Sequence, residues 1–237
     1  MIGLLASRRL EGELMDDPAV DKGEHRRALS GLGRINRVSR TAAALWPPIA
    51  RIAARRYRGP LSMLDVASGG GDVAVSLGRH AHHAQIALKI QGCDISSTAL
   101  DYASERAEKA GVPVSFFCLD ALSESIPAHY DIITVTLFLH HLSDAQIITL
   151  LRKLSAHTDH LLVSDLIRSR TGYVLAWLGT RLLSTSAIVR EDGLRSVRAA
   201  LTLAKARELS AAAGLENAEF ERHWPQRFLM HWERRVE

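Results

Sequence analysis

The sequence predicts an α/β fold with a mostly parallel sheet, and three features of the 237-residue chain support this. Apolar segments of strand length alternate with helical segments between residues 61 and 165, as in repeated β–α–β units. Residues 130–137 are apolar almost throughout, which is typical of a strand buried on both faces of a sheet. Residues 217–224 and 226–235 meet at Pro225 without room for a crossover, so this last pair of strands must be antiparallel.

The strands and helices of the repeated units follow in chain order. The first five strands are expected at residues 61–67, 87–95, 114–119, 130–137 and 160–165. The helices between and after them are expected from about residue 72, at 97–110, at 144–155 and at 202–213. Ser96 and Ser143 precede two of these helices, and a serine at that position accepts a hydrogen bond from a free amide of the first turn.

Two parts of the chain lie outside this alternation. Residues 1–60 are predicted to form an N-terminal helical arm, because arginines and apolar residues interleave there at helical spacing until Gly59-Pro60 stops the pattern. Residues 61–237 form the second predicted domain. Within it, residues 166–200 are expected to be a cap insertion, because they follow the fifth strand and can fold over the carboxyl ends of the strands.

Charge and composition restrict the class of protein. The first 60 residues hold 12 basic and 6 acidic residues, while the whole chain carries a net charge of +4. Such a basic arm permits peripheral contact with an anionic membrane, but nucleic acid is an improbable substrate because the arm lacks stacking aromatics and metal-finger spacing. Two cysteines, no signal peptide and no membrane span predict a soluble, cytoplasmic protein. No oligomeric state is predicted.

A glycine-rich turn marks the expected ligand site. Ser68-Gly69-Gly70-Gly71 joins the first strand to the first helix, and glycines there let a ligand approach the backbone amides. Asp65, Asp94 and Asp120 lie at the ends of three successive strands, at the edge where open α/β sheets bind ligands. A tight turn that uses glycine only for its shape would not explain this acidic series.

The charge of this site separates two candidate ligands. Gly69-x-Gly71-x-x-Ala74 also satisfies the dinucleotide fingerprint. Asp72, however, begins the helix where a pyrophosphate would lie, and its carboxylate would oppose that anion. S-adenosylmethionine has no phosphate and carries a sulfonium and an ammonium group. The acidic residues therefore favour a methyl donor over a nicotinamide dinucleotide.

About two-thirds of the chain resembles the class I S-adenosylmethionine-dependent methyltransferases. The matching segments are LDVASGGGD (64–72), GCDIS (92–96), CLDAL (118–122), YDIITVTLFLHHL (130–142) and ARELSAAAGL (206–215). The HHL motif and DG…SVR (192–198) resemble a small-molecule branch that includes ubiquinone- and menaquinone-biosynthesis and phenol O-methyltransferases. The resemblance implies a Rossmann-like, seven-stranded sheet with the last strand antiparallel. Ala67 departs from the pattern, because the family usually has glycine there.

The resemblance also implies a set of cofactor-binding residues. These are Asp65, Ala67, Gly69, Gly71, Asp94, Ile95, Asp120, Ala121 and Leu137. Residues of the first strand and turn would surround the methionine moiety, Asp94 would hold the ribose hydroxyls, and Asp120 would accept from the adenine amino group. Ile95 would pack on the adenine, and Leu137 would line the floor near the sulfonium. Arg37 is chosen over Arg34 and Arg40 as the cation for the cofactor carboxylate.

His140 and His141 are the candidate catalytic residues. Methyl transfer to a phenol requires alignment and removal of a proton, and a histidine suits that task near neutral pH. The alternative is that one of them packs or caps the helix after Ser143. No metal is expected, because neither a cysteine nor a carboxylate near the pair completes a ligand set.

The predicted function is methylation of a small apolar aromatic acceptor, with O-methylation of a phenol, quinol or polyketide ring as the leading prediction. C-methylation of a quinone-type ring and a non-catalytic nucleotide-binding protein of the same fold are the alternatives. The arm and the cap are expected to enclose the acceptor. The apolar side chains considered for this are Leu14, Met15, Leu45, Trp46, Tyr173, Leu175, Trp177 and Leu178.

Overall fold

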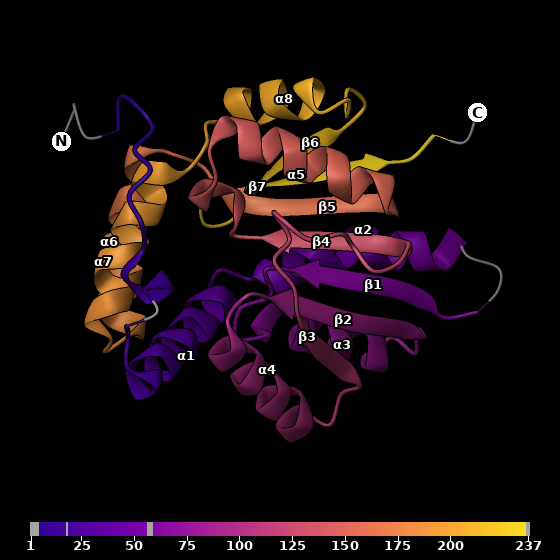
Figure 1. Ribbon diagram of the computed structural model, residues 1–237, viewed down its shortest axis with the longest axis horizontal. Coiled ribbons are helices and arrows are strands. Elements are labelled where there is room, and N and C mark those ends of the chain that lie inside the picture. Colours follow the sequence, from indigo (N-terminus) through magenta and orange to yellow (C-terminus); the bar gives the residue numbers. More distant parts are fainter. Residues whose placement is uncertain (1–4, 18, 56–58, 236–237) are drawn as a thin grey trace.

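The computed structural model describes residues 5–17, 19–55 and 59–235 and contains one seven-stranded sheet (Figure 1). Its strand order is β3-β2-β1-β4-β5-β7-β6, in which β1 to β5 run parallel and β7 runs antiparallel to both neighbours. The strands are β1 (Leu61–Val66), β2 (Leu88–Asp94), β3 (Val114–Cys118), β4 (Tyr130–Thr136), β5 (Thr158–Leu166), β6 (Glu219–His223) and β7 (Arg227–Glu233). The predicted fold class is confirmed, and each strand ends within two residues of its predicted bounds.

The helices follow the predicted alternation. They are η1 (Leu14–Asp16), α1 (Lys22–Val38), α2 (Thr41–Arg55), α3 (Asp72–His83), α4 (Ser97–Ala110), η2 (Leu139–His141), α5 (Asp144–Ala156), α6 (Arg170–Leu183), α7 (Ala187–Ala199) and α8 (Leu203–Ala212). The Ser96 side chain accepts from the Ala99 amide, and Ser143 forms a capping box with Gln146, so both predicted caps are confirmed. Residues 1–4, 18 and 56–58 of the predicted arm lie outside the described residues.

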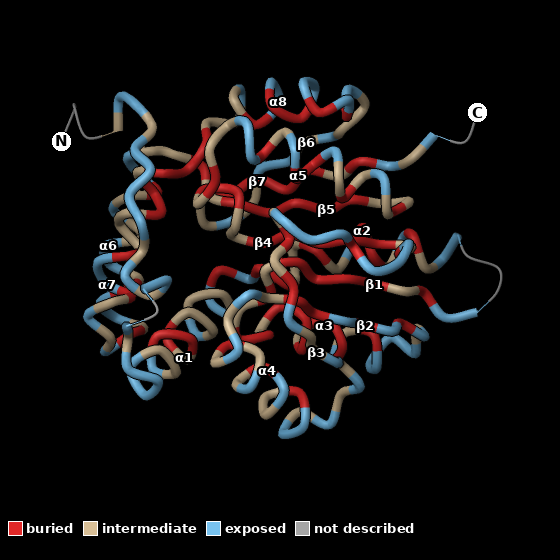
Figure 2. Tube along the Cα trace, viewed as in Figure 1, coloured by how far each residue is buried: buried red, intermediate tan, exposed pale blue. Residues whose placement is uncertain are grey.

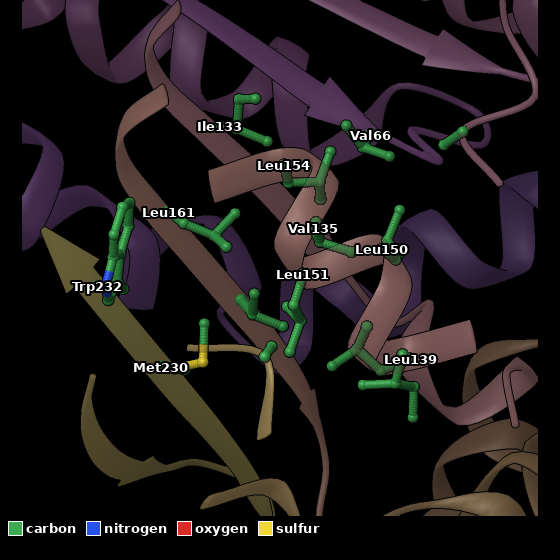
Figure 3. Close-up of a cluster of buried hydrophobic side chains, with 14 of the residues drawn as sticks. Val66, Ile133, Val135, Leu139, Leu150, Leu151, Leu154, Leu161, Met230 and Trp232 are labelled. Carbon is green, nitrogen blue, oxygen red and sulfur yellow. The ribbon is translucent and has the colours of Figure 1, made fainter. Parts of the chain in front are cut away.

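One face of the sheet is covered by α5 and α8. Leucines of α5, among them Leu151 and Leu154, pack against Ile133 and Leu161 of β4 and β5 (Figure 3). Because successive strand residues point to opposite faces, Ile132 contributes to the core on the other side. This alternation explains why β4 is apolar almost throughout.

The opposite face is covered by α2 and α3. Leu45 and Ile49 of α2 are completely buried and pack in one cluster with Met63 of β1. The expectation that Leu45 helps to enclose an acceptor is therefore wrong. The helix lies on the sheet because its apolar residues form one continuous stripe that only the sheet can bury.

The cap is a helical hairpin at the carboxyl edge of the parallel strands. Residues 170–199 form α6 and α7, which pack together and against α1, and the N-terminal segment with η1 runs along α7 (Figure 1). Arg8 fastens this segment, because its guanidinium donates to the Leu142 carbonyl oxygen at 2.7 Å and pairs with Asp144 at 2.9 Å. Figure 2 shows buried residues concentrated in the strands and exposed residues along the outer helices. No helix of the described chain has the length and apolar character needed to span a membrane.

Candidate active site

A cavity of about 1140 Å³ lies between the carboxyl edge of the sheet, α1 and the cap hairpin. This exceeds the usual 300–1,000 Å³ of small-molecule sites, so there is room for two ligands. Nine of the predicted site residues line it: Ala67, Gly69, Asp94, Ile95, Asp120, Ala121, Leu137, His140 and His141. Asp65, Gly71 and Arg37 do not.

The glycine-rich turn has the shape that a close backbone approach requires. Gly71 adopts φ 67° at the N-cap of α3, and a Cβ there would lie 2.7 Å from the Phe116 ring. Two residues that do line the cavity, Ala67 at φ 53° and Leu137 at φ 55°, adopt the same left-handed conformation without being glycine. Such strain in two non-glycine residues is typical of functional sites.

We expect Ala67→Gly to stabilise the fold by about 1 kcal/mol, because glycine removes the steric cost of the left-handed conformation. The measurement is the urea midpoint without ligand. Ala103→Gly in the interior of α4 is the control, and it should destabilise by about 1 kcal/mol. A loss of stability in both variants would contradict the assignment of strain to Ala67.

Asp94 and Asp120 form a polar wall of the cavity. The Asp94 carboxylate accepts from the Gly69 amide at 2.8 Å and from the Ser96 amide at 2.9 Å. Burial raises the pKa of Asp94, although these amides oppose the shift. Asp120 accepts from the Leu122 amide at 2.9 Å. Each carboxylate retains lone pairs that can accept from ligand hydroxyl or amino groups.

Ile95 lies between these two strand ends and is 68% exposed, which is unusual for a large aliphatic side chain that lines a cavity. Exposed apolar surface next to a polar wall suits a planar ring that packs on one face and forms hydrogen bonds at its edge. The predicted adenine contact at Ile95 is consistent with this placement, and it stays a prediction.

Asp65 is placed differently from the other two strand-end aspartates. Its side chain is completely buried and accepts from the Thr134 hydroxyl at 2.7 Å, while its second oxygen has no partner. Burial raises the pKa of Asp65 to about 7. Arg37 lies outside the cavity as well, on an exposed turn of α1 that lines a separate hollow beside Asp72 and Arg106.

His140 is buried between two carboxylates. Its Nδ1 lies 2.7 Å from Asp165 Oδ1, and its Nε2 lies 3.5 Å from Glu13 Oε1. The exposed fraction of the side chain is 5%. The two carboxylates outweigh the effect of burial and raise the pKa of His140 to about 10, so that the imidazole is charged at neutral pH in this arrangement.

His141 completes the cluster from the adjacent position. Its Nε2 lies 3.8 Å from Glu13 Oε1, and its Nδ1 lies 3.3 Å from Asp16 Oδ2. Glu13 also accepts from the Ser196 hydroxyl of α7. Neither histidine caps α5, because Ser143 does. The capping alternative is therefore excluded.

Sequence reasoning missed both carboxylates that contact His140. Asp165 had a usable signal, because it ends the fifth predicted strand just as Asp94 ends the second. Glu13 had none, since 127 positions of sequence separate it from His140 and no motif surrounds it. Glu13 reaches the site because Asp192 of α7 accepts from the Leu14 and Met15 amides and holds η1 in place.

The reason given for expecting no metal is wrong, because Glu13 is the carboxylate that the adjacent histidines lacked. Ligand atoms of Glu13, His140 and His141 all lie within 4.8 Å of one another, close enough to hold a divalent cation. Ion pairs between imidazolium and carboxylate account for the same contacts without a metal.

The apolar wall of the cavity comes from the arm and the cap. Its apolar residues include Met15, Val20, Leu29, Leu32, Ile35, Leu175, Leu178, Leu182 and Leu183. Of the side chains considered from sequence, Met15, Leu175 and Leu178 line the cavity, whereas Leu14, Trp46, Tyr173 and Trp177 do not. Trp46 instead stacks on His80 of α3. The cavity therefore joins a polar half over β1 to β3 to an apolar half beneath the helices.

Comparison with known proteins shows similarity to methyltransferases. Residues 63–160 match the family model described as a methyltransferase domain. A ubiquinone biosynthesis O-methyltransferase from Methylococcus capsulatus is 25% identical over 169 residues, which cover 64% of this chain and 69% of that protein. Its counterpart from Burkholderia vietnamiensis is 27% identical over 124 residues, 51% of each chain. The chain spans about half the length of most of the curated relatives it matches.

Solved structures agree on the fold. Human N-acetylserotonin methyltransferase in complex with S-adenosylmethionine has a TM-score of 0.66 at 16% identity, over 91% of this chain and 57% of that one. Magnesium protoporphyrin IX methyltransferase from Synechocystis with bound S-adenosylhomocysteine has a TM-score of 0.57 at 16% identity, over 86% and 84% of the two chains. Together with the domain match over residues 63–160, the glycine-rich turn and the sheet order, these findings support a class I S-adenosylmethionine-dependent methyltransferase.

Proposed function

We propose that this protein transfers the methyl group of S-adenosylmethionine to a hydroxyl group of a small, apolar aromatic acceptor. The observation that carries the proposal is the buried His140–Asp165 pair, because His140 lines a cavity whose other walls suit a nucleoside on one side and an apolar ring on the other. The curated relatives are named as ubiquinone biosynthesis O-methyltransferases, which supports a hydroxyl acceptor on a small molecule.

The residues of the polar half fit the cofactor. Asp94, already oriented by the Gly69 and Ser96 amides, is placed to accept from both ribose hydroxyls. Ala67 and Leu137, which follow β1 and β4 and both adopt positive φ, line the part of the cavity where the methionine moiety would lie. Bound S-adenosylmethionine supplies a methyl group on a sulfonium, which needs no further activation.

His140 is proposed to take the proton of the acceptor hydroxyl through Nε2. Asp165 accepts from Nδ1–H, which fixes the tautomer and leaves Nε2 directed at the cavity. Glu13 is the obstacle, because its carboxylate keeps a second proton on the ring while it lies 3.5 Å from Nε2. We propose that the acceptor hydroxyl takes the place of Glu13 and that the imidazolium then releases its Nε2 proton to solvent, so that the neutral ring can accept the hydroxyl proton only when the acceptor is bound.

The pH dependence tests this displacement. Glu13→Gln keeps the shape but removes the charge, so it should lower the pKa of His140 in the free enzyme and move the rising limb of kcat/KM to lower pH. The limb of kcat should move little, because it reports the acceptor complex. Glu11→Gln is the control, since Glu11 lies in the same segment but pairs with Arg198 at 3.0 Å. Identical kcat/KM profiles for wild type and Glu13→Gln would contradict the displacement.

The same pKa shift has a consequence for stability. The pKa of His140 in the fold, about 10, is above its ordinary value of 6.5. The stabilisation from its ion pairs with Asp165 and Glu13 is therefore complete below pH 6.5 and is lost as the pH rises from 6.5 to about 10. Despite the opposing effect of burial, contact with His140 lowers the pKa of Asp165 and of Glu13, so both carboxylates stay charged through this range.

Product analysis with an isotopically labelled donor tests the function as a whole. The purified protein is incubated with phenols, quinols and aromatic polyketide-type compounds, and the position of the label is read by mass spectrometry. A methoxy product is expected. A methyl group on ring carbon would favour C-methylation, and no product with any acceptor despite cofactor binding would favour a non-catalytic role. A parallel assay with a chelator decides whether the Glu13–His140–His141 cluster works through a metal. If it does, the chelator should abolish activity and added Zn²⁺ should restore it.

A further inference from the structure

Arg227 is a buried cation for which the fold provides no anionic partner. It is the first residue of β7, pairs with Leu166 at the carboxyl end of β5, and is 3% exposed. Its guanidinium donates to the Thr41 hydroxyl and, at 3.1 Å, to the Asn36 side-chain oxygen, both of which are neutral. Among residues 5–17, 19–55 and 59–235, no carboxylate forms an ion pair with it, and its Nε–H has no hydrogen-bond partner.

This arrangement is costly unless a ligand completes it. Burial lowers the pKa of Arg227 to about 10, and the more distant charges of Asp165 and Asp72 offset the burial only in part. An unpaired buried charge destabilises a protein by several kcal/mol. The usual compensation is an anion, and an arginine with a free N–H is well suited to a carboxylate.

The cavity wall around Arg227 belongs to the cofactor half. Arg227 lines the cavity together with Asn36, Ser39, Gly70 and Asp72, which are the corner between α1 and α2 and the start of α3. The hydrogen bonds from Arg227 to Thr41 and Asn36 hold its guanidinium at the corner of α1 and α2, which lines the same cavity as Gly70 of the glycine-rich turn. The guanidinium thus lies near the turn, although its backbone lies on the far side of β4 and β5.

The strand order decides which end of the cofactor faces this point. The sheet runs β3-β2-β1-β4-β5-β7, with Asp120 after β3, Asp94 at the end of β2 and Arg227 at the start of β7. A molecule with its adenine at Asp120 and its ribose at Asp94 therefore directs its opposite end across β1 towards Arg227. In S-adenosylmethionine that end carries the only anionic group, the carboxylate.

We infer that Arg227 receives the carboxylate of the cofactor's methionine moiety, an inference that rests on the proposed cofactor. This replaces Arg37, which lies outside the cavity and lines a separate hollow. Thr41 and Asn36 then act as positioning residues, because they hold the guanidinium at the corner of α1 and α2. Cofactor binding would also tie β7 to the two arm helices through one ion pair.

Calorimetry with two ligands isolates the carboxylate. S-adenosylhomocysteine is compared with its decarboxylated analogue, which keeps the adenosine, the thioether and the amine. Wild type should bind the complete ligand at least tenfold more tightly. Arg227→Met should lower the affinity for S-adenosylhomocysteine tenfold or more and change the affinity for the decarboxylated analogue by less than twofold. Arg37→Met is the control and should leave both affinities unchanged.

Each other outcome has a definite meaning. An equal loss for both ligands in Arg227→Met would show that Arg227 only clamps the α1–α2 corner and would overturn the inference. No loss for either ligand would overturn it too. If Arg227→Met does not fold, Arg227→Lys is used instead, because lysine retains the charge without the planar guanidinium. This variant should weaken the binding of S-adenosylhomocysteine and leave that of the analogue unchanged. Failure of wild type to bind either ligand would instead contradict the proposed function.

Discussion

Replacing His140 by alanine should lower turnover by about 10²–10⁴-fold at pH 7, the usual contribution of a positioned general base. The pair with Asp165 is buried and short at 2.7 Å, and a water molecule in the vacated space would lack the fixed orientation of the ring. Affinity for S-adenosylhomocysteine should stay within about threefold, because Asp94 and the glycine-rich turn are untouched. The measurements are steady-state turnover with the acceptor found by product analysis and calorimetry with the product cofactor.

The pH profile separates loss of a base from loss of packing. Part of the lost turnover should return above about pH 10, where a phenolic acceptor ionises without help. His141→Ala is the matched control, since its side chain is 24% exposed and does not contact Asp165; we expect a smaller loss there. His140→Gln should fold normally and remain slow at pH 7. Full turnover in both alanine variants would show that alignment alone suffices and that neither histidine is the base.

Asp94→Ala should weaken the binding of S-adenosylhomocysteine by about 1.5–3 kcal/mol, or roughly 10- to 150-fold, the scale of hydrogen bonds to a charged group. Asp94 lines the cavity and also orients the turn, because it accepts from the Gly69 amide at 2.8 Å. Its removal affects the ribose contact directly and the turn indirectly. Calorimetry on wild type and variant measures the combined loss.

A second ligand separates these two effects of Asp94→Ala. The 2′,3′-dideoxy analogue of S-adenosylhomocysteine has no ribose hydroxyls, so wild type should bind it weakly. The variant should bind the analogue and the complete ligand with similar affinity. If the variant still prefers the complete ligand by the wild-type ratio, the ribose hydroxyls are held elsewhere and Asp94 serves only the turn. NAD should bind wild type far more weakly, because Asp72 opposes a pyrophosphate at the start of α3.

Local sequence patterns were sufficient to predict the strands of the sheet and the serine caps of two helices. The apolar length of residues 130–137 predicted a strand covered on both faces, and Ile132 and Ile133 do point into the two separate cores. The serine caps of α4 and α5 could be predicted because a cap depends on residues within one helical turn. Most of the predicted cofactor-binding residues line the cavity for the same reason, since they lie at or directly after the ends of strands, and their roles stay predictions.

Local patterns could not predict which faces of the cap and arm helices line the cavity. Residues 170–199 form two amphipathic helices, but no pattern states which of their faces lies over the strands and which is exposed. Leu175 and Leu178 line the cavity while Trp177, between them, is 44% exposed. The arm divides for a similar reason: α1 faces the cavity and α2 lies on the sheet, although both carry arginines and apolar residues at the same spacing.

The sequence by itself determined the positions of the strands along the chain, the glycine-rich turn and the acidic residues at the strand ends, because these depend on neighbours within a few positions. Only the tertiary structure decided which charges meet. Glu13 faces His140 because Asp192 holds η1 against α7, and Arg227 is left unpaired because Thr41 and Asn36 offer it neutral oxygens. Whether a charge is paired or unpaired depends on distances of a few ångströms between segments more than a hundred residues apart, and no local pattern contains those distances.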